Sequence, residues 1–335
     1  MRINGLTTAG LRTVGFIARR IAYAIGLLLA VAILNFSLIH LAPGDIVETI
    51  VGEMGGASAE TIASLRKAYG LDKSFVEQLL IYVTRVASGD LGMSTYFNKP
   101  VLGLVADRMF ATVLLVFTAL GIAVVAGTFL GVTAARRPSS WLGALVTITA
   151  LFGFSAPVFW SGLMLLLLFA SVWPILPASG MYDIAAGSTG FAYALEVAHH
   201  LVLPAFTLAI IYLALYSRLS RASMIEVLGS DYVRTARAKG LSENKVVFKH
   251  ALRNAVLPVV TIAGLQFSGM LAGAVLVETV FTWPGMGLLA FEAILRRDTQ
   301  LILGILLLSA LLVIVGNLLT DLAYRLIDPR IRTDG

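Results

Sequence analysis

The sequence predicts an all-α polytopic membrane protein with six transmembrane helices. Of its 335 residues, 58% are hydrophobic and 13% are charged, about half the charged share of a soluble domain. We interpret six apolar runs as transmembrane helices; twenty helical residues span about 30 Å, and five of these runs have at least that length. These runs are residues 21–41, 112–135, 141–172, 201–216, 257–277 and 299–319. We therefore expect lipid, not water, to surround most of the chain.

Residues 1–20 are expected to form a short cytoplasmic tail, and residues 21–42 the first transmembrane helix. A cleaved signal peptide would have a shorter apolar core and a small-residue cleavage site, so we expect this helix to be retained. Residues 43–107 form an extracytoplasmic insertion with helical periodicity in 60–71 and 74–87. The remaining helices form a core over residues 108–320, in which Pro157 predicts a kink, and residues 321–335 form a second cytoplasmic tail.

The distribution of Lys and Arg predicts the orientation. If both termini lie in the cytoplasm, 17 of the 25 Lys and Arg residues fall on the cytoplasmic side. This bias is the usual one for membrane proteins, and it places the most basic loop in the cytosol. Trp173, Tyr182 and Trp283 then fall at the outer interface, where amphipathic rings are common.

Residues 217–257, which we call the basic loop, interrupt the apolar runs with eight cationic side chains. Ser230 or Asp231 can cap a first short helix, and Gly240 follows its cationic end as a glycine able to adopt positive φ. In a second helix, capped by Ser242, Lys245, Lys249 and Arg253 form a cationic stripe. Val247, Ala251 and Ala255 form a parallel apolar stripe, and Pro258 begins the next span. The flanking membrane spans argue against nucleic-acid binding by this basic helix-turn-helix.

The sequence lacks the motifs of several classes of enzyme and of ion-coupled transporter. The spans contain almost no ionisable residues between their ends, whereas a secondary transporter or proton pump needs them to bind its coupling ion. There is no G-x-x-x-x-G-K-[ST] phosphate loop and no cysteine. The adjacent His199 and His200 have no thiol at ligand spacing and are expected to be interfacial, so we expect no metal site. The serines and histidines lack hydrolase motifs, so we expect no catalytic residues.

The spacing of the basic loop resembles the "EAA" loop of binding-protein-dependent ABC importer permeases. Arg234, Thr235 and Ala236 occupy the three signature positions, with Arg234 in place of the glutamate, and Gly240 is the motif's glycine. In that family this loop docks into a cleft of a cytosolic ATPase. The resemblance therefore implies an ATPase-coupling site, which comprises Val233, Arg234, Thr235, Ala236, Arg237, Lys239, Gly240 and Leu241.

A second stretch resembles the outer loop of peptide and nickel importer permeases. Its matching residues are Glu278, Phe281, Pro284, Gly285, Gly287 and Asp298. From the residues alone, this stretch is a turn followed by a short amphipathic helix outside the membrane. Ala42-Pro43-Gly44-Asp45, Leu91-Gly92-Met93-Ser94 and Lys99-Pro100-Val101 extend the resemblance to the "B"-type permeases of dipeptide and oligopeptide importers. We expect the 43–107 insertion and this outer loop either to contact a binding protein or only to cap the bundle.

The resemblance implies a type I ABC importer permease fold in a bacterial inner membrane, with ATP and Mg bound by partner subunits and no cofactor in this chain. The implied partners are a second homologous permease, two cytosolic ABC ATPases and an extracytoplasmic solute-binding protein. The translocation path is expected to use small polar side chains, namely Ser155, Ser161, Thr207, Gln266 and Ser268. The expected substrates are di- or oligopeptides, with nickel, glutathione, opines or oligosaccharides as alternatives. A secondary transporter or channel, a scaffold without flux and an intramembrane enzyme are more distant alternatives.

Overall fold

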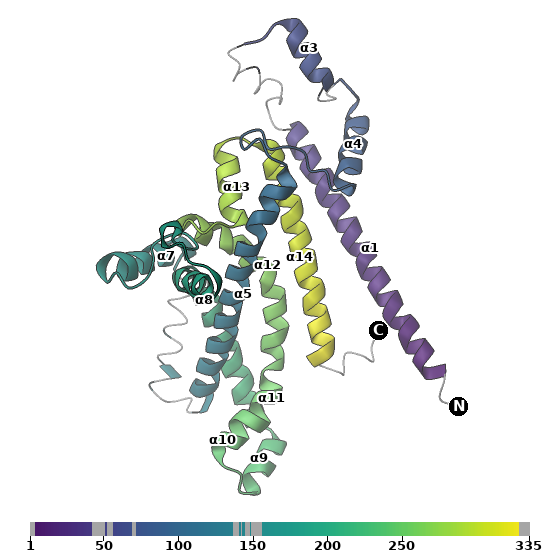
Figure 1. Cartoon of the computed structure of the whole chain (residues 1–335). Helices are drawn as coiled ribbons and strands as arrows, with labels where there is room; N and C mark the ends of the chain where they lie inside the picture. Colours follow the sequence, from purple (N-terminus) through teal and green to yellow (C-terminus); the bar gives the residue numbers. More distant parts are fainter. Residues whose placement is uncertain are drawn as a thin grey trace. The chain divides into compact units, whose positions relative to one another are not determined.

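The computed structural model describes residues 4–41, 51, 56–68, 72–136, 141, 143–144, 148 and 156–327 (Figure 1). Apart from one isolated β-bridge between Met93 and Pro100, regular structure in these residues is helical. The chain divides into two compact units. Unit 1 comprises Met1–Val105 with Ala293–Ile314, and unit 2 comprises Ala106–Glu292 with Val315–Gly335.

Unit 1 contains α1 (Asn4–Leu41), α3 (Ala59–Ala68) and α4 (Phe75–Ala87). Ser74 and Glu77 form a capping box at the start of α4, and His40 bonds Gln78 across the contact between α1 and α4 at 2.8 Å. The helices predicted in 60–71 and 74–87 are confirmed as α3 and α4. Helical structure begins at Asn4, within the residues predicted to form the N-terminal tail, and no proline interrupts α1. Residues 42–45 lie outside the described residues.

Unit 2 is built around long helices that share one apolar core. They are α5 (Val101–Arg136, whose first five residues belong to unit 1), α8 (Gly190–Leu228) and α12 (Leu257–Val280). Shorter α7 (Val158–Leu166), the π-helix η1 (Leu167–Val172) and α13 (Met286–Leu295) accompany them, and α14 (Thr299–Ile327) runs through both units. Leu115, Leu208, Tyr216, Met270 and Trp283 are fully buried in this core.

Five of the helices in the described residues are long and apolar enough to span a bilayer. They occupy Arg19–Leu38, Val101–Arg136, Gly190–Leu228, Leu257–Val280 and Thr299–Thr320. The third predicted run is described mainly from residue 156 onward, where Val158–Val172 is apolar but shorter. Pro157 was expected to kink a helix; it stands instead at the N-cap of α7, consistent with its lack of a backbone N–H.

The glycines of α5 allow α8 to approach it closely. A Cβ at Gly127 would lie 2.8 Å from Tyr216 Cβ, and one at Gly131 would overlap the carbonyl of Ser217 and the side chain of Ser220. Gly269 and Gly273 of α12 have the same spacing but are less constrained, since an added Cβ would meet only side-chain atoms at 3.2 Å or more. The contact between α5 and α8 therefore depends on two residues that have no side chain.

Gly131→Val is expected to destabilise unit 2 by about 1–3 kcal/mol, because the contact with Ser217 involves backbone that cannot move aside. Thermal unfolding of the detergent-purified protein measures the effect. Gly121→Val is the matched control on the same helix, since an added Cβ there meets nothing within 4 Å. Equal melting temperatures for the two variants would contradict the packing assigned to Gly131.

Candidate functional site

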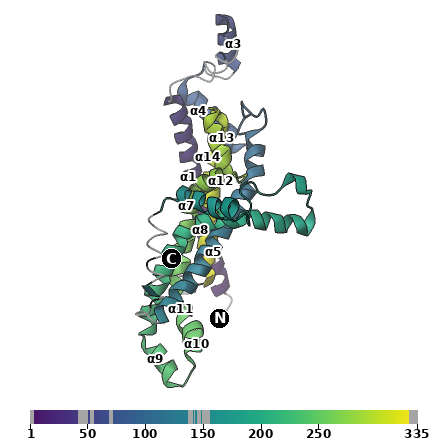
Figure 2. The ribbon, with the colours of Figure 1, turned by 90° about the vertical axis from the view of Figure 1, so that its left-hand side faces the viewer.

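The basic loop folds as two helical segments at one end of unit 2, and α13 lies at the opposite end (Figures 1 and 2). The first segment is α9 (Asp231–Ala238). The second is continuous and comprises α10 (Glu243–Lys245), the π-helix η3 (Val246–Ala251) and α11 (Leu252–Ala255). The two predicted helices are confirmed, but α8 continues to Leu228, well beyond the predicted end of the span at Tyr216. Ser and Arg residues lower the hydropathy but are compatible with an α-helix. The apolar run therefore ends before α8 does.

Gly240 makes the turn between the two segments. Its φ is +77°, as predicted, and its N–H donates to the carbonyl of Arg237 at 2.9 Å. A residue with a Cβ would cost roughly 1–2 kcal/mol in this left-handed conformation. Ser230 stands at the N-cap position of α9, but its hydroxyl donates to the Val227 carbonyl and does not cap the helix. Ser242 likewise makes no side-chain cap.

The α9 helix is amphipathic and packs on unit 2 through one face. Val233 and Ala236 are buried in a cluster that includes Val132 and Ala135 of α5, Met224 of α8, and Val246, Val247, Ala251 and Ala255. The predicted apolar stripe of the second segment is thus confirmed, and Leu241 packs partly buried against the same cluster. Burying a side chain the size of Val233 stabilises the packed loop by about 1.5–3 kcal/mol. The loop is therefore attached rigidly to α5 and α8.

The opposite face of α9 is exposed and cationic. It presents Arg234, Thr235, Arg237 and Lys239, with Gly240 at the turn. Arg234 makes one loose contact with Asp231 at 3.5 Å, and both side chains are largely exposed. Lys245, Lys249 and Arg253 are exposed on the second segment. A cationic surface on a rigid support is suited to contact with another protein.

Polar contacts brace the turn and connect it to α5. Arg237 makes a bidentate ion pair with Glu243: its Nη2 lies 2.8 Å from one carboxylate oxygen and its Nε lies 3.2 Å from the other. Arg136 at the end of α5 donates to Asn244 at 2.8 Å, and Asn254 donates to the hydroxyl of Tyr232 at 2.9 Å. The hydrogen bond from Arg237 lowers the pKa of Glu243 below its usual value of 4.5.

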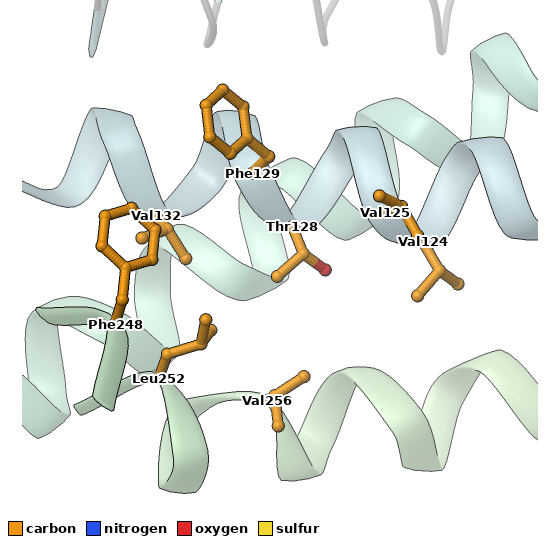
Figure 3. Close-up of a pocket in the computed structure, with 8 residues that line it drawn as sticks. All are labelled: Val124, Val125, Thr128, Phe129, Val132, Phe248, Leu252 and Val256. Atoms are coloured by element: carbon orange, nitrogen blue, oxygen red, sulfur yellow. The ribbon is translucent and has the colours of Figure 1, made fainter. Parts of the chain in front are cut away.

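An apolar hollow of about 380 Å³ lies between α5 and the second segment. Figure 3 shows Phe248 and Leu252 pointing toward Val132 and Thr128 of α5, with Val256 beside them. Among the residues that the structure describes, the lining consists of apolar side chains and Thr128.

At the other end of unit 2, a buried carboxylate joins three helices. Glu278, in the last turn of α12, has no exposed surface. It accepts hydrogen bonds from Thr112 Oγ1 of α5 at 2.7 Å, from Gly287 N at 2.6 Å and from Leu288 N at 3.1 Å. Thr112 Oγ1 in turn accepts from Met286 N at 2.8 Å. We call these five residues the carboxylate clamp.

Two glycines lie so close to Glu278 that neither position has space for a side chain. A Cβ on Gly285 would overlap the carboxylate of Glu278, and a Cβ on Gly287 would meet both that carboxylate and the backbone of Val275. Trp283 was expected at the outer interface, but it is fully buried and its indole N–H donates to the carbonyl of Ala111 at 2.9 Å. The α13 helix is apolar rather than amphipathic. These differences arise because the segment folds back onto α5.

The residues expected in the outer loop differ in exposure. Glu278, Phe281 and Asp298 are buried, and Pro284 is partly buried. Within unit 1, Asp298 accepts hydrogen bonds from Ser94 Oγ and Tyr96 N and from Leu301 N at the start of α14. These acidic residues therefore shape the loops from within, and exposed neighbours such as Tyr96 and Arg296 form their surface.

The residues expected along a translocation path are not gathered into one cavity in the described part of the chain. Ser161 and Thr207 are buried where α7 meets α8, Gln266 and Ser268 lie half-buried on α12, and Ser155 lies outside the described residues. His199 and His200 contact the carbonyls of Ile175 and Ser179. Within the described residues, no group of three or more metal-ligating side chains is present.

Comparison with known proteins identifies the family of this chain. Residues 127–333 match the family of inner membrane components of binding-protein-dependent transport systems, and residues 13–118 match the N-terminal part of such membrane components. The chain belongs to this family. It is 41% identical to the dipeptide transport system permease protein DppB of Escherichia coli, over 95% of this chain and 98% of that protein. It is 42% identical to the di/tripeptide transport system permease protein DppB of Pseudomonas aeruginosa, over 95% and 98% respectively.

Solved structures place the chain in the same fold. The inward-facing MetNI methionine ABC transporter aligns with a TM-score of 0.53 and 16% identity, over 68% of this chain and 97% of the matched chain. The protein is thus a multi-pass inner-membrane permease with an ABC importer permease fold, and hydrolysis of ATP belongs to partner subunits. Membership also implies ATPase and binding-protein partners.

Sequence reasoning did not identify three features of the site. Thr112 stood at the start of an apolar run without any motif to mark it. The pair of Arg237 and Glu243 could have been found, since a glycine turn between two short helices brings their facing ends together. The π-helix η3 leaves no periodicity signal, because it differs from an α-helix by a single inserted residue.

The ion pair of Arg237 and Glu243 predicts that acid loosens the turn. Because the folded-state pKa of Glu243 is lowered, its contribution is present above the unfolded value near 4.5 and is lost as the pH falls through the folded pKa. The effect should be about 0.2–1 kcal/mol, as for other exposed pairs. The protection factors of the Gly240 and Leu241 amides, which correct for the intrinsic exchange rate at each pH, should fall below that pH, and Glu243→Gln should already show lower protection at pH 7. Identical protection in wild type and variant would contradict this assignment.

Proposed function

We propose that this chain is the permease subunit of an ATP-driven, binding-protein-dependent importer of di- or oligopeptides. The observation that carries the substrate class is the 41–42% identity, across nearly the full length, to permeases named for dipeptides and di/tripeptides. The chain pairs with a second homologous permease to form the path. Two cytosolic ATPases drive the pair, and an extracytoplasmic solute-binding protein delivers the peptide.

The permease has six transmembrane helices of the type I arrangement with both termini in the cytoplasm. The apolar run of residues 141–172, which includes α7, supplies the sixth span beside the five long candidates. The excess of Lys and Arg in the basic loop supports its cytosolic placement. Residues 43–107 and the segment after α12 then face outward, where the binding protein docks.

The basic loop is the site of coupling to the ATPase. Its exposed face, with Arg234, Thr235 and Arg237, docks into the ATPase, while Val233 and Ala236 hold α9 to α5 and α8. Closure of the ATPase dimer on ATP moves the loop as a rigid body, and the helices switch between inward-open and outward-open states. Ser155, Ser161, Thr207, Gln266 and Ser268 contribute to a path that the second permease completes.

Reconstitution tests this function directly. The chain, its second permease, the two ATPases and the binding protein are assembled in proteoliposomes, and uptake of a radiolabelled dipeptide is measured. We expect uptake only with ATP and all components, and none from this chain alone under an ion gradient. Uptake by the isolated chain would instead favour a secondary transporter. Uptake of nickel, glutathione, an opine or an oligosaccharide in preference to peptides would show that peptides are not the substrate class.

Gly240→Glu is expected to leave the permease inserted but to separate ATP hydrolysis from uptake. The positive φ of Gly240 disfavours any side chain, so the turn that orients α9 must shift. ATP-dependent uptake should fall at least tenfold while membrane insertion stays at the wild-type level.

Gly229→Glu is the matched control, because Gly229 is exposed in the same loop but has an ordinary φ of −81°. It should transport at close to the wild-type rate. Wild-type uptake by a correctly inserted Gly240→Glu variant would show that the Gly240 turn is not part of the coupling site.

A further inference from the structure

The α5 helix connects the two sites described above. It runs for 36 residues, about 54 Å, and contains no proline. One end contributes Val132 and Ala135 to the cluster beneath α9, and Arg136 bonds Asn244 of the basic loop. About 30 Å along the helix, Ala111 and Thr112 hold Trp283 and Glu278. Long helices without proline or an inserted residue bend only gently, so the two ends of α5 move together.

The carboxylate clamp is suited to fasten α13 to this helix. Its carboxylate oxygens accept from the hydroxyl of Thr112 and from two N–H groups in the first turn of α13, which have no partner within that helix. Breaking such a bond inside a buried site leaves a polar group without a partner, which costs about 1–3 kcal/mol. The attachment of α13 to α5 is thus rigid as well as specific.

Apolar contacts and a second hydrogen bond support the same join. Trp283 and Phe281 are buried in the core that contains Ala111 and Leu115, and the indole N–H of Trp283 is bonded to α5. Gly285 and Gly287 cannot accept a Cβ while Glu278 occupies its position. The backbone of the turn is therefore shaped around the carboxylate, and α13 has no space to slide along α5.

We propose that Thr112 and Glu278 are positioning residues that fix α13 to α5, so that movement of the basic loop reaches α13 at the opposite end of unit 2. This inference rests on the proposed function, because it assumes that the loop receives movement from an ATPase. It assigns α5 the role of a rigid connection between that loop and the α13 segment, with the carboxylate clamp as its far attachment.

The first test compares coupling in variants of the clamp, using the complete importer in proteoliposomes. Thr112→Val removes the hydroxyl with little change in shape, and Glu278→Gln replaces one acceptor oxygen with an N–H₂ group. Uptake per ATP hydrolysed should fall at least tenfold in both variants. Thr112→Ser keeps the hydroxyl and should restore the ratio. Thr128→Val is the matched control on α5, because the Thr128 hydroxyl is buried and has no hydrogen-bond partner among the described residues.

A ratio within twofold of wild type in both Thr112→Val and Glu278→Gln would overturn the proposal. So would a parallel loss of uptake and ATP hydrolysis that follows the amount of folded complex, since that outcome indicates a purely structural role. Uptake by the wild-type complex is measured in the same experiment. Its absence would count against the proposed importer function itself, whereas a change confined to the variants reports on the clamp.

A distance measurement tests the rigid connection without relying on activity. The chain contains no cysteine, so Val125→Cys on α5 and Phe291→Cys on α13 give a spin-label pair at two exposed positions. In the assembled complex, the distance between the labels should be the same without nucleotide and with ATP trapped. With Glu278→Gln added, the distribution should broaden or shift between the two states. A changed distance in the otherwise wild-type complex, or no effect of Glu278→Gln, would overturn the proposal.

Discussion

The packing of α9 against α5 and α8 is the interaction on which the position of the basic loop depends. Val233 and Ala236 point inward from a helix whose remaining residues are exposed, so a short cationic helix is held by a small apolar cluster. An isolated eight-residue helix would be marginal in water, because helix nucleation is costly. Attachment to α5 and α8 provides the missing stability. The same packing holds the basic loop rigidly on α5 and α8.

Charge burial organises the opposite end of the unit. A carboxylate without exposed surface is tolerated only when its oxygens are fully hydrogen-bonded. Glu278 satisfies this condition with one side chain and two backbone N–H groups, and Asp298 does so separately within unit 1. Both acids stabilise turns by bonding to the starts of helices. Their burial leaves exposed neighbours such as Tyr96 and Arg296 to form the surface beside them.

Much of the local structure was predictable from the sequence, and particular residues show why. Gly240 follows a cationic helix end, and its positive φ is the usual consequence of that pattern. Val247, Ala251 and Ala255 recur at helical spacing and are buried as expected. By contrast, Trp283 was assigned to the interface from its position after a span. Aromatic residues in a turn can face lipid or core, and only the return of the turn onto α5 distinguishes the two.

Sequence by itself determined that this chain is a helical membrane protein, where its apolar helices lie, and which loop resembles a coupling site. Those properties follow from composition, periodicity and local motifs, which short segments carry independently of one another. Only the tertiary structure decided that Thr112 meets Glu278 and that Gly131 touches α8. Residues 166 positions apart make the first of these contacts. Their pairing depends on how whole helices pack, and no local preference of either residue encodes that packing.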